Sequence, residues 1–249
     1  MFWDLDEHSD KDSPFPHMLP NSDYWTRMLW SFGIENDDHI IVYDFSDLHS
    51  ACRLWFSLKY FGHQKISILD GGMKKWLKEN RPTSNKINKD IGRFSYIDKI
   101  NTKNKYKVSE NLDWVKKKEQ IDENIKNYSF TLVDARSRER FEGKIEEPRP
   151  GLIKGCIPGS KNIPYQKCID SETNTFKTKS ELVKIFEEND VDYNKPLVFS
   201  CDAPRTTRRG RRGSTPIDDP GRLARAEAAA GVAHRDPHAR RVGRTAGGN

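Results

Sequence analysis

The stretch Asp134-Ala-Arg-Ser-Arg-Glu-Arg-Phe-Glu-Gly143 and the later stretch Lys195-Pro-Leu-Val-Phe-Ser-Cys201 together organise this chain. Two arginines, Arg140 and Arg149, belong to this region, and a short apolar strand ends at Cys201. Guanidinium groups suit planar anions, and a thiolate is a strong nucleophile. The region therefore indicates a cysteine nucleophile that acts on a small anion. The residues alone fit a structural cysteine and solvated arginines as well.

Short apolar runs alternate with helical patterns along the chain. The runs 39–43 and 66–69 have the length and composition of buried parallel strands. Between them, apolar residues recur at helical spacing over 54–61, and a further helix is expected around Trp76. This alternation predicts an α/β fold with parallel sheets flanked by helices. Helix caps are expected at Asn21 or Ser22, Ser50, Ser109 and Ser180.

The 249 residues are enough for two domains, each with its own core. A stretch rich in Lys, Asn and Asp, with little apolar periodicity, separates them. We predict an N-terminal domain at 1–85, a linker at 86–106 and a second domain at 107–201. Residues 202–249 are rich in Arg, Ala and Gly and contain no aromatic residue, so we expect a disordered tail foreign to the domains.

The net charge of +6 lies in that tail, which holds 11 arginines against five acidic residues. The remaining 32 basic and 32 acidic residues leave 1–201 neutral. Nucleic-acid binding through residues 205–212 is the alternative that this charge suggests, but no aromatics are interleaved there, so we expect no nucleic-acid partner. No apolar run is long enough to span a membrane, and no secretory signal is seen, which predicts a cytoplasmic protein.

The four cysteines show neither a CxxC pair nor metal-ligand spacing. We therefore expect reduced thiols, no metal and no organic cofactor. The residues around Cys52 and Cys168 in the sequence indicate no chemical role for either thiol.

A series of short motifs carries a family resemblance through residues 1–201. The chain resembles the two-domain rhodanese-type sulfurtransferases, and most closely their 3-mercaptopyruvate branch. The motifs are His17-Met-Leu-Pro20, Val42-Tyr-Asp44, Leu69-Asp-Gly-Gly72, Asp134-Ala-Arg136, Glu147-Pro-Arg149, Asn162-Ile-Pro164 and Ser200-Cys201.

The resemblance implies tandem rhodanese-like domains, of which the first is catalytically silent and the second carries the cysteine. A faint internal repeat agrees, because Asp44 in Ile41-Val-Tyr-Asp44 takes the place of Cys201 in Val198-Phe-Ser-Cys201. On this alignment the opening of the first copy and the remainder of the second are missing. We therefore expect both domains to be incomplete.

The resemblance also assigns roles to residues. Cys201 is the nucleophile that carries sulfur as a persulfide, and Arg140 and Arg149 hold the carboxylate and keto oxygen of the donor. Asp6 and His17 belong to a proton-handling network, although His17 fits a local turn equally well. The implied partners are a small sulfur donor, 3-mercaptopyruvate or thiosulfate, and a thiol or cyanide acceptor, with thioredoxin as a candidate acceptor.

The loop after Cys201 departs from the family pattern. Asp202 puts a negative charge beside the thiol, Ala203 replaces the serine of the proton network, and Pro204 removes an N–H donor. Cys156 stands where the family has a histidine. These changes predict little turnover, and the alternative function is a catalytically inactive rhodanese-like binding protein.

Overall fold

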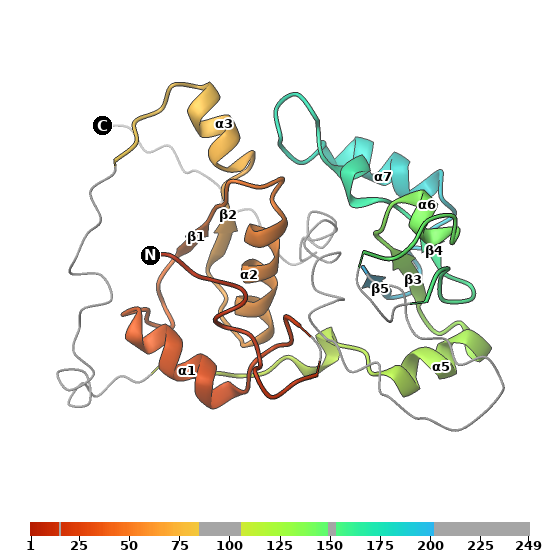
Figure 1. Ribbon diagram of the computed structural model, residues 1–249, viewed down its shortest axis with the longest axis horizontal. Coiled ribbons are helices and arrows are strands. Elements are labelled where there is room, and N and C mark those ends of the chain that lie inside the picture. The colour runs from red at the N-terminus through yellow and green to blue at the C-terminus, as the bar shows by residue number, and fades with distance from the viewer. Residues whose placement is uncertain (15, 85–105, 149–152, 202–249) are drawn as a thin grey trace, which may run out of the picture.

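The computed structural model describes residues 1–14, 16–84, 106–148 and 153–201. Two parallel sheets with helices packed around them form this part of the chain (Figure 1). One sheet pairs β1 (Ile40–Val42) with β2 (Ile66–Ile68), and the other has the strand order β4-β3-β5. Its strands are β3 (Thr131–Asp134), β4 (Lys161–Asn162) and β5 (Leu197–Ser200). The expected α/β fold, with parallel sheets flanked by helices, is confirmed.

Three helices surround the first sheet: α1 (Ser22–Ser31), α2 (His49–Tyr60) and α3 (Gly72–Lys78). The apolar faces of α1 and α2 meet in a core where the rings of Trp25 and Phe61 stack with centroids 4.6 Å apart. Both side chains are fully buried, and each large apolar side chain removed from water contributes roughly 1.5–3 kcal/mol to folding. Asn21 caps α1 as expected, because its side chain accepts from the Tyr24 N–H at 2.8 Å.

The start of α2 differs from the expected cap at Ser50. Leu48 is the N-cap residue, in the left-handed region with φ 66°, and its side chain makes no capping hydrogen bond. The Asp44 carboxylate instead reaches from the end of β1 and accepts from the Ala51 N–H at 2.9 Å. A side chain distant in sequence therefore satisfies a first-turn donor, which local cap patterns cannot reveal.

The second sheet is accompanied by α5 (Lys118–Asn127), α6 (Arg138–Phe141), α7 (Lys179–Glu187) and the 3-10 turn η2 (Tyr165–Cys168). The 3-10 turn η1 (Leu112–Trp114) instead places its Trp114 ring against Trp55 and Phe56 of α2. The expected cap at Ser180 is wrong. Thr178 begins α7 instead, in a capping box with Glu181. This pairing satisfies two orphan N–H groups at once, whereas a lone serine satisfies one.

The expected helix cap at Ser109 is also wrong, because Ser109 packs against the elements around the first sheet. We call these elements the first unit, and those around the β4-β3-β5 sheet the second unit. The Ser109 N–H donates to the Phe61 carbonyl at 3.1 Å, and Gly62 lets the backbones approach, since a Cβ there would meet the Ser109 oxygen at 2.6 Å. Tyr106 is buried in the same core, with Val108 packed against it. We therefore propose that the first unit extends past residue 106. Residues 86–105 of the expected linker, residue 85 before it and the tail from 202 lie outside the described residues.

The segment 169–176 of the second unit lies against α2 and α3 of the first (Figure 1). Asp70 Oδ1 accepts from the Phe176 N–H at 2.9 Å, and Asn174 Nδ2 donates to the Gly71 carbonyl at 3.2 Å. The Phe176 ring packs on Leu48 and Cys52. Polar and apolar contacts together fix the position of this segment on the first unit.

Acidic pH is expected to destabilise the fold through His63, which is 1% exposed. Its Nε2 lies 2.9 Å from the Asp38 carbonyl and its Nδ1 lies 2.8 Å from the Tyr106 hydroxyl, which suits a neutral ring. Burial lowers the pKa of His63 below its ordinary 6.5, despite the opposing effect of Asp38. In the unfolded chain His63 binds a proton near pH 6.5, whereas in the folded chain it binds one only at lower pH. The free energy of unfolding therefore decreases as the pH falls below 6.5.

Urea unfolding at about pH 7.5 and about pH 5.5 measures this loss. In His63→Gln the stability should be lower overall but should change less between the two pH values. The exposed His39→Gln variant is the control and should keep the wild-type pH dependence. An unchanged dependence in His63→Gln would contradict this assignment.

Candidate active site

Cys201 directly follows β5, at the carboxyl end of the second sheet. Ser200 pairs with Asp134 of the central strand, and the Ala135 N–H donates to the Ser200 carbonyl at 2.8 Å. The ends of β3 and β5 therefore lie side by side, so the half-buried Cys201 leaves the sheet next to the Asp134 segment. The carboxyl edge of parallel strands is where α/β folds bind their ligands.

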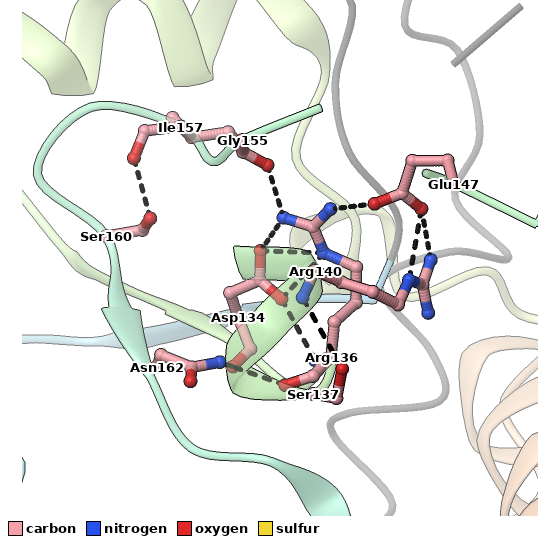
Figure 2. Close-up of polar contacts among 9 residues, drawn as sticks. All are labelled: Asp134, Arg136, Ser137, Arg140, Glu147, Gly155, Ile157, Ser160 and Asn162. Atoms are coloured by element: carbon pink, nitrogen blue, oxygen red, sulfur yellow. Dashed lines mark hydrogen bonds and ion pairs between the residues drawn. The ribbon is translucent and has the colours of Figure 1, made fainter. Parts of the chain in front are cut away.

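A buried ion network lies at the end of β3, centred on Arg136 (Figure 2). The Arg136 side chain is 0% exposed, and its Nε donates to both Asp134 oxygens at 3.0 Å. Its Nη1 donates to Glu147 Oε1 and its Nη2 to the Gly155 carbonyl, each at 2.7 Å. Burial opposes the charge, but the Asp134 and Glu147 carboxylates outweigh this and raise the pKa of Arg136.

Arg140 joins this network from helix α6. Its Nε donates to Glu147 Oε2 at 3.1 Å, and its Nη2 also contacts this oxygen (Figure 2). Glu147 therefore holds Arg136 with one oxygen and Arg140 with the other. The Arg140 side chain is 20% exposed whereas that of Glu147 is 1% exposed, so Arg140 forms the accessible side of the network. Sequence reasoning gave no role to Arg136 or Glu147, although each stands in a motif it used.

Asp6 and His17 are brought together by the N-terminal loop. His17 Nε2 and Asp6 Oδ1 lie 2.7 Å apart, with His17 in the left-handed region at φ 64°. The buried Arg53 guanidinium donates to the His17 carbonyl, which holds the loop in this conformation. The pairing of these two residues is therefore present. Arg149 and Ala203 lie outside the described residues, so a clamp of two arginines facing the thiol stays a prediction.

Cys52 and Cys168 have buried surroundings that disfavour a thiolate. Cys52 is buried, and burial, followed by the nearby Asp44 charge, raises the pKa of its thiol well above the ordinary value. Burial raises the pKa of Cys168 to about 11, against a small lowering by Lys177. Because the thiolate is the reactive form, neither is suited to nucleophilic chemistry.

Tyr165 lies between the two units, at the end of β4. Its N–H donates to the Ala135 carbonyl at 3.0 Å, and its ring meets that of His49 edge to face with centroids 4.1 Å apart. Burial raises the pKa of Tyr165, and the charges of Asp47 and Cys201 raise it further. The charge of a first-unit carboxylate and that of the proposed nucleophile therefore both act on the Tyr165 hydroxyl.

Within residues 1–14, 16–84, 106–148 and 153–201, no three His, Cys, Asp or Glu side chains are grouped to hold a metal ion. In the same part of the chain, every helix is too short or too polar to cross a membrane.

Comparison with known proteins decides the family. Residues 9–79 and 117–212 both match the Rhodanese-like domain family. The chain belongs to the rhodanese family. The second match ends at residue 212, 11 residues beyond Cys201.

This rhodanese is similar to sulfurtransferases from several organisms. It is 38% identical over 203 residues to 3-mercaptopyruvate sulfurtransferase of Mus musculus, covering 80% of this chain and 64% of that protein. It is 35% identical over 213 residues to thiosulfate/3-mercaptopyruvate sulfurtransferase 1, mitochondrial, of Arabidopsis thaliana, covering 81% and 55%. The chain thus spans less than two thirds of these relatives.

The fold resembles the crystal structure of SseA from Escherichia coli, described with the 3-mercaptopyruvate sulfotransferases. The TM-score is 0.68 at 27% sequence identity, over 93% of this rhodanese and 76% of SseA.

Replacing Arg140 with lysine is expected to weaken donor use. A lysine ammonium cannot span the Glu147 carboxylate and a planar anion as a guanidinium does. A lost hydrogen bond to a charged group is worth about 1.5–3 kcal/mol, so kcat/KM for 3-mercaptopyruvate should fall roughly 10- to 100-fold. Steady-state kinetics measure this. The control is Arg138→Lys on the same helix, whose side chain is 67% exposed and pairs with Glu142. Equal kinetics in the two variants would exclude a donor-binding role for Arg140.

Proposed function

We propose that this chain transfers a sulfane-type sulfur from 3-mercaptopyruvate, or from thiosulfate, to a thiol or cyanide through a persulfide on Cys201. The observation that carries the proposal is the position of Cys201. It leaves β5 beside the end of β3, from which the Arg136–Glu147–Arg140 network extends. A thiol and a partly exposed guanidinium that follow adjacent strands of one sheet suit an anionic sulfur donor.

In the first half-reaction, the Cys201 thiolate attacks the sulfur of 3-mercaptopyruvate. An S–S bond forms and the donor's C–S bond breaks, and its electron pair moves into the enolate of pyruvate. The enolate takes up a proton to give pyruvate, while the thiol proton stays on the outer sulfur of the persulfide. With thiosulfate the same attack breaks the S–S bond of the donor and releases sulfite. Arg140 stabilises the negative charge of the donor throughout.

Asp6 and His17 supply proton handling in this proposal. Asp6 accepts from Nε2 of His17 and so orients the ring, which is the role of an acid beside a catalytic histidine. A protonated His17 gives the enolate its proton. In the second half-reaction an acceptor thiolate takes the outer sulfur and restores the Cys201 thiolate, and thioredoxin is one proposed acceptor.

The deciding experiment is a single-turnover reaction, which detects even slow chemistry. The full chain is mixed with one equivalent of 3-mercaptopyruvate and its intact mass is measured before and after reduction. We expect a gain of one sulfur atom, located on the Cys201 peptide, together with one equivalent of pyruvate. Absence of the added sulfur with either donor would refute the transfer function. It would favour the inactive binding protein that Asp202 and Pro204 suggest.

The compartment stays a proposal as well. The Arabidopsis relative is described as mitochondrial, whereas we propose the cytoplasm for this chain. Fractionation of cells that express the tagged chain decides between the two compartments.

A further inference from the structure

A cleft of about 280 Å³ lies where the two units meet. One wall is formed by the lysines of α3, namely Lys74, Lys75 and Lys78. The other wall is formed by the second unit, from Tyr165 and Gln166 to the segment 169–174 that docks on the first unit. The cleft is thus built by both units, and its two walls differ in charge.

The three lysines differ in the groups that their ammonium nitrogens contact. Lys74 is paired with the Asp47 carboxylate at the base of the cleft. Lys78 donates to a backbone carbonyl, that of Glu172, at 3.1 Å. Lys75 Nζ lies 3.9 Å from Glu79 Oε1, which is a weak exposed pair. Because an ammonium group carries three donors, Lys75 and Lys78 keep donors for an anionic ligand.

Tyr165 links the cleft to the sheet edge at which the proposed nucleophile lies. Tyr165, in the cleft wall, donates its N–H to the Ala135 carbonyl, and the N–H of Ala135 donates to Ser200. Tyr165 follows β4 and Cys201 follows β5, the two strands that flank β3, so both leave the same edge of the sheet on either side of Ala135. The rise in the pKa of Tyr165, caused by burial and then by Asp47 and Cys201, agrees with this closeness.

We propose that this cleft binds the carboxylates of a small acidic thiol that accepts sulfur, with Lys75 and Lys78 as the recognition groups. This inference rests on the proposed sulfur transfer. The acceptor thiolate attacks the outer sulfur of the Cys201 persulfide, forming an S–S bond to the acceptor. The bond to Cys201 Sγ breaks, its electron pair returns to the Cys201 thiolate, and the outer sulfur leaves with its proton as the acceptor persulfide. No oxidant or reductant is needed.

The test separates binding from turnover. (Methylthio)succinate, which has two carboxylates and no reactive thiol, is titrated into the full chain by calorimetry. We expect the wild type to bind it and Lys75→Gln/Lys78→Gln, which lacks both recognition charges, to bind it about 10-fold more weakly, a change of about 1.4 kcal/mol. Lys126→Gln/Lys179→Gln removes the same charge from α5 and α7 and should bind like the wild type.

Turnover supplies the second readout. With mercaptosuccinate as acceptor, the KM of the cleft variant should rise about 10-fold, while the KM for neutral 2-mercaptoethanol and the rate of persulfide formation stay unchanged. No binding of (methylthio)succinate to the wild type, or the same loss in the control pair, would overturn the inference. If all chains fail to transfer sulfur while calorimetry gives the expected difference, the cleft stands as an acid-binding site and the proposed function falls.

Discussion

Replacing Cys201 with serine is expected to abolish sulfur transfer. A serine hydroxyl keeps the shape of the side chain but does not ionise at neutral pH and cannot form the S–S bond of a persulfide. Loss of a covalent nucleophile removes nearly all of the chemical rate, so turnover should fall by at least about 1000-fold. The intact mass after exposure to 3-mercaptopyruvate should equal that of the untreated chain. Pyruvate release, followed in the same samples, should fall in parallel.

Cys156→Ser is the matched control, because Cys156 is also half-buried and lies next to Gly155 of the ion network. It should keep the added sulfur and the release of pyruvate. Cys168→Ala gives a second control, since burial raises the pKa of that thiol to about 11 and it should carry no persulfide. Sulfur uptake that survives in Cys201→Ser, or that vanishes in Cys156→Ser, would contradict the assignment of Cys201 as the nucleophile.

Replacing Arg136 with methionine is expected to destabilise the fold severely. The change keeps much of the side-chain length but leaves the Asp134 and Glu147 carboxylates buried without their shared cation. Removing one partner of a buried ion pair costs about 3–5 kcal/mol, because the charges left behind are unsolvated. This is a large part of the roughly 5–15 kcal/mol that stabilises an ordinary domain. Urea unfolding followed by circular dichroism measures the loss.

Two further variants show whether the loss comes from unpaired charge. Arg138→Met removes an exposed pair with Glu142 and should cost less than about 1 kcal/mol. The triple change of Asp134→Leu, Arg136→Met and Glu147→Met removes the charges together and should recover part of the stability lost by Arg136→Met alone. A triple variant less stable than the single one would show that the hydrogen bonds of the network, including that to Gly155, matter more than charge balance.

Much of the fold could be predicted from local sequence. The apolar runs 39–43 and 66–69 contain β1 and β2, and Asn21 caps its helix as its residue type indicates. The wrong cap at Ser180 has a local cause, the Thr178–Glu181 capping box, whereas the errors at Ser50 and Ser109 come from competition by distant partners. Asp44 supplies the first-turn contact of α2, and Ser109 is bound by the Phe61 carbonyl rather than by a helix. Such partners are set by tertiary packing and leave no trace in the local pattern.

The candidate site could be predicted at the positions where the type of residue alone indicates its chemistry. A cysteine at a strand end and arginines after the neighbouring strand indicated the site, and the family resemblance supplied the Asp6–His17 pair. The position of Arg136 was not predictable, because its motif does not tell whether its charge faces solvent or two buried carboxylates. The lysines of α3 were equally hidden, since their significance depends on the segment 169–174 lying opposite them.

The docking of residues 169–176 onto α2 and α3 has a consequence for chimeric proteins. Each unit contributes one wall to the cleft, and Asp70 and Gly71 are matched to Phe176 and Asn174 through backbone and side-chain hydrogen bonds. A hybrid that joins the amino-terminal half of this chain to the carboxy-terminal half of a relative would keep every presumed reactive group. It would nevertheless bring together two surfaces that were never selected to fit, so recombination within this family should succeed only when both surfaces are exchanged together.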